Sequence, residues 1–212
     1  MAKKVKNIYE GKELGALFVR PELLMQPNIV KPLHSVAPRT IMGQWWWDRQ
    51  RQRCYEKNNF HCYSCGVHKS DAPFRQWLEA HESYKIDLEN CRYTLDELVG
   101  LCHACHNFIH SGRMLSLVNQ GKASRYRMET ILDWGNNLLA FNGLDKSKAW
   151  WKKDGIFQQF FPEHIGTWNK WHLILDGEKF YSPFKDYAAW AKNYDQKDTE
   201  LEPVDFTLLT DG

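Results

Sequence analysis

The sequence has no long hydrophobic run. Its apolar stretches are a few residues each, whereas a membrane-spanning helix needs about 20 consecutive and mostly apolar residues. No membrane association is therefore expected. The chain opens with Met1-Ala2-Lys3-Lys4 and lacks the apolar segment of a secretory signal peptide. We therefore expect a cytoplasmic protein, in a reducing compartment where disulfides rarely persist.

The chain also lacks a strong charge of one sign. With 28 Lys and Arg against 26 Asp and Glu, its net charge is +2, which is too small to indicate nucleic-acid binding by itself. The local distribution is more informative, because Arg49, Arg51 and Arg53 form a short basic run. Such a run either contacts a phosphate backbone or, more commonly, lies on a solvated face.

Cysteines are few, but their spacing is specific. Four of the six form two Cys-x-x-Cys pairs, Cys62/Cys65 and Cys102/Cys105. Four thiolates suit a closed tetrahedral zinc site, because soft sulfur satisfies zinc and leaves no open coordination position. Disulfides or plain buried cysteines are the alternative, and the expected reducing compartment disfavours disulfides. The pattern therefore predicts one structural Zn²⁺.

Three histidines accompany these cysteines. The second pair is followed at once by His106 and His110, which would project from the same face of a helix and can share a metal ion. His81 lies upstream, in the segment Leu78-Glu79-Ala80-His81-Glu82. Imidazole ligands of this kind leave exchangeable coordination positions, which a hydrolytic metal requires. The histidines therefore predict a second, catalytic divalent-ion site.

The first part of the chain predicts an arm followed by a helix. Residues 1–40 contain four prolines and are expected to form an irregular N-terminal arm that lies on the rest of the protein. A helix is expected over residues 40–57. Thr40 would cap this helix, and Trp45 and Tyr55 would belong to its apolar stripe.

The cysteine and histidine segments predict a zinc knuckle, a β-hairpin and a short helix. The knuckle is expected at residues 60–66. Strands at residues 76–80 and 95–101 would form the hairpin and bring His81 toward the metal. A helix at residues 104–109 would follow, with Gly112 as its stop signal.

The rest of the chain predicts further helices around a second hairpin. A strong helical pattern covers residues 122–141, and a two-residue turn at Asp176-Gly177 predicts a hairpin over residues 171–181. The fold class is therefore α+β. We divide the chain into an arm at 1–40, a core with flanking helices at 41–143 and an aromatic-rich α/β extension at 144–212.

Taken together, these residues resemble the zinc-stapled type of HNH endonuclease over roughly residues 36–114. The resemblance is carried by Cys62-Tyr-Ser-Cys65-Gly66, by Leu78-Glu79-Ala80-His81-Glu82 and by Leu101-Cys102-His-Ala-Cys105-His106-Asn-Phe-Ile-His110. It implies a small ββα-metal core and hydrolysis of phosphodiester bonds in DNA, with nicking as one form of cleavage. It also implies a catalytic Mg²⁺ or another divalent ion in addition to the structural Zn²⁺.

The resemblance implies roles for individual residues. His81, His106 and His110 would be catalytic and would hold the divalent ion. If His81 is a ligand, Glu82 takes the position of the general base. If His81 is the base, Ala80 stands where a ligand should be, and alanine cannot coordinate. We favour His81 as the ligand, with Glu82 as its coupled partner.

Two departures support a different interpretation. Ala80 is one, and Glu97 is the other, because it stands near the place of the expected asparagine; Asn90 is a nearby substitute. The alternative function is therefore a catalytically inactive, zinc-organised module that binds nucleic acid or protein in a phage or bacterial complex.

The expected partners follow from the same comparison. DNA would be contacted by Arg49, Arg51, Arg53 and Arg113, although Arg113 is equally expected to cap a helix C-terminus. The aromatic C-terminal region would dock a protein partner.

Overall fold

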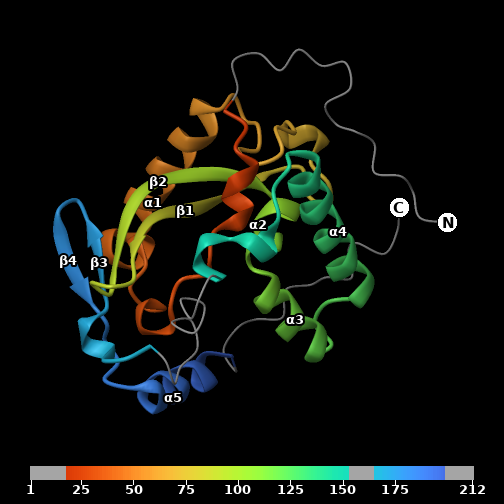
Figure 1. Ribbon diagram of the computed structural model, residues 1–212. Helices are drawn as coiled ribbons and strands as arrows, with labels where there is room; N and C mark the ends of the chain where they lie inside the picture. The colour runs from red at the N-terminus through yellow and green to blue at the C-terminus, as the bar shows by residue number, and fades with distance from the viewer. Residues whose placement is uncertain (1–17, 153–164, 199–212) are drawn as a thin grey trace.

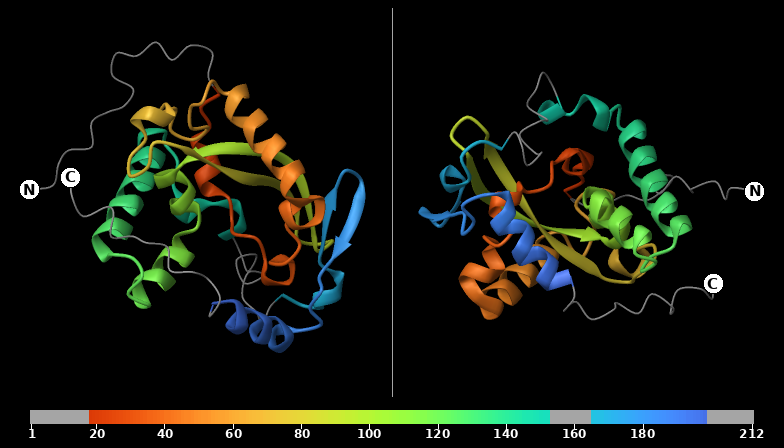
Figure 2. Two further views of the ribbon diagram at one scale, coloured as in Figure 1. Left: turned by 180° about the vertical axis from the view of Figure 1, so that it is seen from behind. Right: turned by 90° about the horizontal axis from the view of Figure 1, so that it is seen from below.

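Five α-helices and one four-stranded sheet make up the part of the chain that the structure describes, so the α+β class is confirmed. The computed structural model describes residues 18–152 and 165–198. Helices α1 and α4 lie on opposite sides of the central hairpin (Figures 1 and 2). Within these ranges, no helix combines the length and the apolar character that crossing a bilayer requires.

The sheet has the order β1-β2-β3-β4. β1 (Leu78–Asp87) and β2 (Arg92–Cys102) form an antiparallel hairpin, which is longer than the sequence predicts at both strands. β3 (His172–Leu175) pairs in parallel with the start of β2 and antiparallel with β4 (Glu178–Tyr181). The C-terminal hairpin therefore extends the same sheet that carries His81 and Cys102.

The turn of the C-terminal hairpin follows the sequence prediction. Asp176 and Gly177 have φ angles of 51° and 83°, and two successive positive φ angles match the right-handed twist of the flanking strands. Glycine adopts such an angle without a steric cost, which explains the Asp-Gly pair at this position.

Helix α1 (Pro38–Lys57) is kinked at Gly43, whose φ of 81° is not helical, and it differs from the prediction in two further ways. It begins at Pro38, whose fixed φ suits a first helical turn, and Ala37 is its N-cap without a side-chain hydrogen bond. The predicted cap at Thr40 is therefore wrong, because Thr40 already lies inside the helix. Trp45 does not belong to a buried stripe either, since it is 70% exposed, whereas Tyr55 is buried as expected.

Three helices follow the hairpin. α2 (His103–Ile109) and α3 (Ser111–Asn119) are separated only by His110, so the predicted helix stop at Gly112 is wrong. The chain turns at His110 and continues at once into α3. α4 (Arg125–Phe141) begins where predicted to within three residues, because the Ser124 side chain accepts a hydrogen bond from the Arg127 N–H at 3.2 Å.

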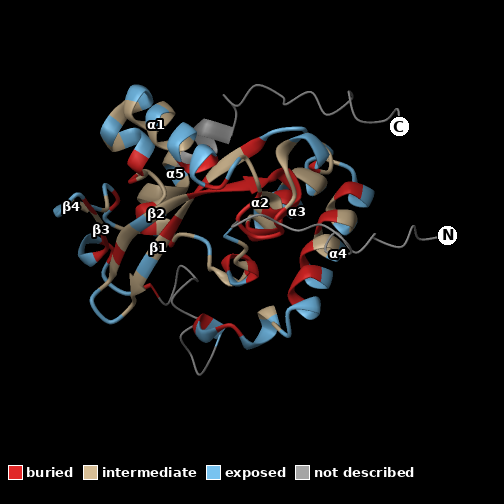
Figure 3. Cartoon of the chain, turned by 90° about the horizontal axis from the view of Figure 1, so that it is seen from above, coloured by how far each residue is buried: buried red, intermediate tan, exposed pale blue. Residues whose placement is uncertain are grey.

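Two hydrophobic clusters stabilise the molecule. The first surrounds the four clustered cysteines between the hairpin, α2 and α4, and the second lies between β2, β3 and α5 (Tyr187–Asp198). Figure 3 shows that buried residues concentrate on β2, on α2 and on the inner side of α4. The described part of the N-terminal arm joins both clusters through Leu24 and Leu33, which are fully buried.

Some predictions concern segments outside the described residues. These are residues 1–17 of the arm and residues 153–164 and 199–212 of the extension.

Candidate metal centres

The four paired cysteines meet in one buried cluster. Cys62 and Cys65 lie in the turns between α1 and β1, Cys102 is the last residue of β2, and Cys105 lies in α2. Their four sulfur atoms lie within 4.8 Å of one another, and all four residues are buried. All four thiols are free, although the sulfurs of Cys65 and Cys102 are 3.7 Å apart. This donor set fits a structural metal such as Zn²⁺.

Backbone hydrogen bonds hold the knuckle in place. The Cys62 N–H donates to the Val67 carbonyl, and the Gly66 N–H donates to the Cys62 carbonyl, both at 2.8 Å. Gly66 has a φ of 73°, which lets the chain turn back after the second cysteine. The Tyr63 N–H donates to the Gly100 carbonyl at 2.9 Å, so the knuckle is fixed to β2 directly before Cys102.

The electrostatics of the cysteine cluster favour a bound cation. Burial raises the pKa of the Cys65 and Cys105 thiols well above the ordinary value, and the neighbouring thiols add to this effect. Four buried thiolates would repel one another without a counter-charge. A divalent cation at the centre supplies that charge, and coordination deprotonates the thiols.

The three predicted histidines form a second cluster. His81 comes from β1, His106 comes from α2, and His110 is the residue that separates α2 from α3. One ring nitrogen from each lies within 4.8 Å of the others. The ring centroids are 5.5 Å apart for His81 and His106, 5.1 Å for His81 and His110, and 4.7 Å for His106 and His110.

Burial keeps two of these imidazoles neutral. It lowers the pKa of His81 well below the ordinary value and lowers the pKa of His110 to about 3, with a further contribution from the neighbouring histidines. A neutral imidazole offers the lone pair that a metal ligand needs. The Nδ1 atom of His81 is buried and has no hydrogen-bond partner among the described residues. These features fit a metal-binding site.

Glu79 fixes one side of the histidine cluster. Its Oε2 atom lies 2.6 Å from Nδ1 of His106, and its Oε1 atom lies 2.5 Å from Nδ1 of His103. Burial alone would raise the pKa of Glu79, but the contacts with His103 and His106 outweigh it and lower the pKa well below the usual range. Glu79 is therefore an ionised carboxylate that is hydrogen-bonded to His103 and lies at ion-pair distance from His106.

A buried arginine extends this network to α4. The Arg127 Nη2 atom lies 2.5 Å from Nε2 of His103. Because a guanidinium can only donate, Nε2 of His103 accepts and Nδ1 carries the proton that points to Glu79. Oε2 of Glu79 lies at ion-pair distance, 2.6 Å, from Nδ1 of His106, which leaves Nε2 of His106 as the ring nitrogen available to a metal. Carboxylates that orient metal-binding histidines act in this way.

Glu82 does not join the histidine cluster. It follows His81 directly on β1, and successive side chains of a strand point to opposite faces. Burial raises the pKa of Glu82, with no charged partner strong enough to reverse the effect.

The predicted DNA-binding arginines lie in different environments. The guanidinium of Arg49 covers the Trp45 ring at 4.5 Å, and Arg53 is exposed. Arg51 Nε donates to Asp48 Oδ1 at 2.7 Å. Arg113 is exposed in the first turn of α3, three residues after His110, which is the C-cap of α2.

The two residues considered for the missing asparagine each have a partner other than the histidines. Arg20 Nη1 lies 2.5 Å from Glu97 Oε1, so Glu97 ties the N-terminal arm to β2. Asn90 lies in the turn of the β1–β2 hairpin, where its side-chain amide donates to Asp87 Oδ2 at 2.8 Å. Neither residue belongs to the histidine cluster.

Comparison of the chain with protein-family models, with curated proteins and with solved structures returns no match. The function must therefore be inferred from the residues and the geometry of the two clusters.

Proposed function

We propose that this protein is a metal-dependent endonuclease of the HNH type that hydrolyses phosphodiester bonds in DNA. The observation that supports it is the convergence of His81, His106 and His110 next to, but separate from, a four-cysteine cluster. A purely structural zinc site needs none of these histidines. Their origin on a strand of the hairpin and on the helix that follows it supports the ββα-metal arrangement that the resemblance implies.

The two clusters suit different tasks. Four thiolates close a tetrahedral site, whereas three imidazoles leave positions for water and a phosphate oxygen. A divalent ion bound there would supply charge stabilisation to the phosphate and to the leaving oxygen. Mg²⁺ prefers oxygen ligands, so three nitrogen donors favour a transition-metal ion in this position.

The protein's own residues orient this site. Glu79 holds His106 with Nε2 turned toward the cluster, and burial keeps His81 and His110 neutral. DNA would approach from the exposed side of the cluster, where Arg113 lies next to His110. Its guanidinium is suited to bind a phosphate.

The test is a nicking assay on supercoiled plasmid with and without added divalent ions. His106→Ala and His110→Ala should each abolish cleavage while zinc content and folding stay intact, because both residues serve the open site. His61→Ala is the matched control, since His61 lies outside the cluster and should leave cleavage unchanged. If either cluster variant lost zinc while a cysteine variant kept it, the division into two sites would be wrong.

A metal titration separates the two roles proposed for His81 and Glu82. If His81 is a ligand and Glu82 the base, His81→Ala should recover part of its activity at high metal concentration. Glu82→Gln should bind metal normally and turn over slowly, since glutamine cannot accept the proton. The opposite pattern would make His81 the base. Glu82 points to the other face of β1, so its role as the general base is the part of the proposal that this titration tests most directly.

The inactive zinc-organised module is the second candidate. It is favoured by Ala80, which offers no ligand, and by Glu97, which is engaged with Arg20 instead of the histidines. This candidate predicts one tightly bound zinc, DNA or protein binding and no cleavage with any divalent ion.

A further inference from the structure

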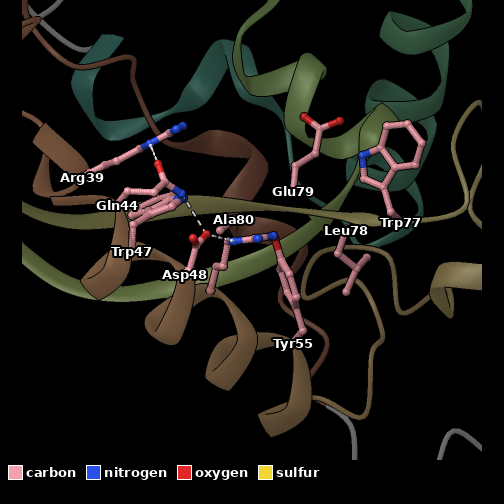
Figure 4. Close-up of a pocket in the computed structure, with 10 residues that line it drawn as sticks. Arg39, Gln44, Trp47, Asp48, Tyr55, Trp77, Leu78, Glu79 and Ala80 are labelled. Carbon is pink, nitrogen blue, oxygen red and sulfur yellow. Dashed lines mark hydrogen bonds and ion pairs between the residues drawn. The ribbon is translucent and has the colours of Figure 1, made fainter.

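A hollow of about 430 Å³ lies between α1 and β1. Its walls include Trp47, Asp48 and Arg51 from α1 and Glu79 from β1, together with Trp77 directly before that strand (Figure 4). Its volume falls in the range of roughly 300–1,000 Å³ that is typical of small-ligand pockets. None of the other described strands pairs with the outer edge of β1, so that edge is left uncovered by the sheet.

Aromatic side chains flank this hollow. Trp77 is 49% exposed, and Figure 4 shows Trp47 and Trp77 on opposite sides. The guanidinium of Arg75, which is not itself a lining residue, lies 4.8 Å from the centre of the Trp77 ring. Exposed indoles with neighbouring arginines are the surfaces on which unpaired bases stack, because every base has a flat π-face.

The polar side chains of the hollow are ordered in a chain. Arg39 Nε donates to Gln44 Oε1 at 2.8 Å, Gln44 Nε2 donates to Asp48 Oδ1 at 2.8 Å, and Arg51 Nε donates to the same oxygen at 2.7 Å. The negative charge of Asp48 is thereby offset. Arg39 uses Nε in this chain, so its terminal amino groups are left to meet a phosphate or the edge of a base.

Glu79 joins the hollow to the histidine cluster. It lines the hollow and at the same time lies 2.6 Å from His106 Nδ1. A DNA strand with one phosphodiester at the histidines would therefore bring an adjacent nucleotide to the hollow. A base within a paired duplex cannot enter such a pocket, because it must first leave the stack.

We propose that this hollow binds an unpaired nucleobase next to the cleaved phosphodiester, stacked against Trp77 and Trp47. The inference rests on the proposed endonuclease function and specifies its substrate as DNA with an unpaired or extruded nucleotide at the cleavage site. The arginines at the rim would hold the adjoining phosphate, and the indoles would select for the presence of a base.

The test measures binding by fluorescence anisotropy with three labelled probes: a short oligothymidylate, the same strand with abasic sites, and a fully paired hairpin. No divalent ion is added, so that cleavage does not consume the probe. The full-length protein should bind the oligothymidylate most tightly. Trp77→Ala should weaken that binding about tenfold and leave the abasic strand unaffected, since stacking on one aromatic ring accounts for about that much.

Matched variants separate stacking from folding. Trp77→Phe should keep most of the affinity because it keeps a π-face. Trp150→Ala removes another exposed indole, 47% exposed and outside the hollow, and should change nothing. Zinc content and circular dichroism of each variant verify the fold.

The proposal is overturned if the wild-type protein binds the abasic and thymidine strands equally, or if Trp77→Ala weakens both to the same extent. Tighter binding of the paired hairpin would also overturn it. The plasmid assay distinguishes this result from failure of the endonuclease proposal. Base-dependent binding without cleavage would support the base-binding hollow and contradict the endonuclease proposal. Cleavage without base-dependent binding would support the endonuclease proposal and contradict the base-binding hollow.

Discussion

Glu79 lies between two histidines that have different surroundings. His103 is buried beside Arg127, whereas His106 faces the cluster with His81 and His110. Burial lowers the pKa of His103, so its ring stays neutral. The ring accepts a hydrogen bond from Arg127 at Nε2 and donates one to Glu79 from Nδ1. The carboxylate is thereby held from one side and can orient His106 on the other.

Replacing this carboxylate should weaken metal binding at the three histidines without disturbing the cysteine cluster. Glu79→Gln keeps the shape of the side chain but removes the negative charge that lies 2.6 Å from Nδ1 of His106. We expect the affinity of the histidine cluster for a divalent ion to fall by about 10–100-fold, which is the usual effect of removing such a partner. Metal titration calorimetry on zinc-loaded protein measures this.

Glu89→Gln is the control for that measurement, because Glu89 is an exposed carboxylate in the hairpin turn. It should bind the ion as the wild type does. Unchanged affinity in Glu79→Gln would show that His106 is oriented by the backbone of α2 alone.

The sequence predicts the candidate metal ligands better than the residues that orient them. Spacing alone is enough for the cysteine pairs and for His106 and His110, because a turn and a helix fix where those side chains point. His103 and Arg127 give no such signal. Each meets its partner only through the packing of α4 against α2, and their contacts join residues 24 positions apart.

The contact between α2 and α4 depends on a glycine. Phe108 lies between His106 and His110 in sequence and is almost fully buried, and its ring occupies the space that a Cβ at Gly135 would fill. Gly135 therefore lets α4 approach closely behind the histidine cluster. Glycine has a low helical propensity, and the close packing of α4 against Phe108 offsets this cost.

Gly135→Ala should destabilise the protein by about 1–3 kcal/mol, the usual cost of overpacking a core. Alanine is the better helix former by about 1 kcal/mol, so propensity alone predicts the opposite sign. Gly112→Ala is the matched control: it is also helical, but nothing lies within 4 Å of the added methyl group. Urea unfolding of both variants gives the comparison, and equal stabilities would contradict this account of the packing.

Helix α5 is attached to the N-terminal arm by a bond that depends on pH. The Trp190 indole N–H donates to Nδ1 of His34 at 3.2 Å, which requires that nitrogen to be unprotonated. Burial lowers the pKa of His34 to about 4, from an ordinary value of 6.5. Acidification therefore opposes the docking of α5.

The direction in which stability changes with pH follows from the lowered pKa of His34 in the folded protein. A histidine with a lowered folded pKa contributes stability that is fully present above about pH 6.5 and is lost as the pH falls toward about 4. The full contribution is on the order of 3 kcal/mol. Other buried histidines also titrate, so thermal unfolding of the wild type should be compared with His34→Gln, which accepts the indole bond at any pH. The stability difference between them should shrink on acidification, and a constant difference would refute it.

Helices, strands and turns were predicted correctly where a local sequence pattern determines them. They were missed where contacts with distant segments determine them. The Asp176-Gly177 turn sets its own hairpin, so the prediction holds. Gly112 has a typical helix-ending residue type, but the chain has already turned at His110 and enters α3. The parallel pairing of β3 with β2 joins residues about 80 positions apart in sequence, and no local pattern specifies it.

For the whole molecule, the cysteine cluster is a point at which several elements meet. It joins the end of β2, the start of α2 and the knuckle that follows α1, within the first hydrophobic cluster. Structural zinc sites in small domains contribute about 10–16 kcal/mol of binding free energy, whereas an entire domain is typically stable by about 5–15 kcal/mol. Loss of the metal can therefore exceed the whole stability of the fold.

Purified wild-type protein should accordingly contain one tightly bound zinc per chain, and Cys102→Ser should be insoluble or unfolded. Cys91→Ser is the control, because Cys91 lies outside the cluster and should keep both zinc and fold. A strong chelator should unfold the wild type cooperatively, and the histidine cluster should be lost in the same transition because α2 carries ligands of both sites. Elemental analysis and circular dichroism during chelation test this coupling. A folded, zinc-free protein would show that hydrophobic packing alone sustains the structure around Cys102.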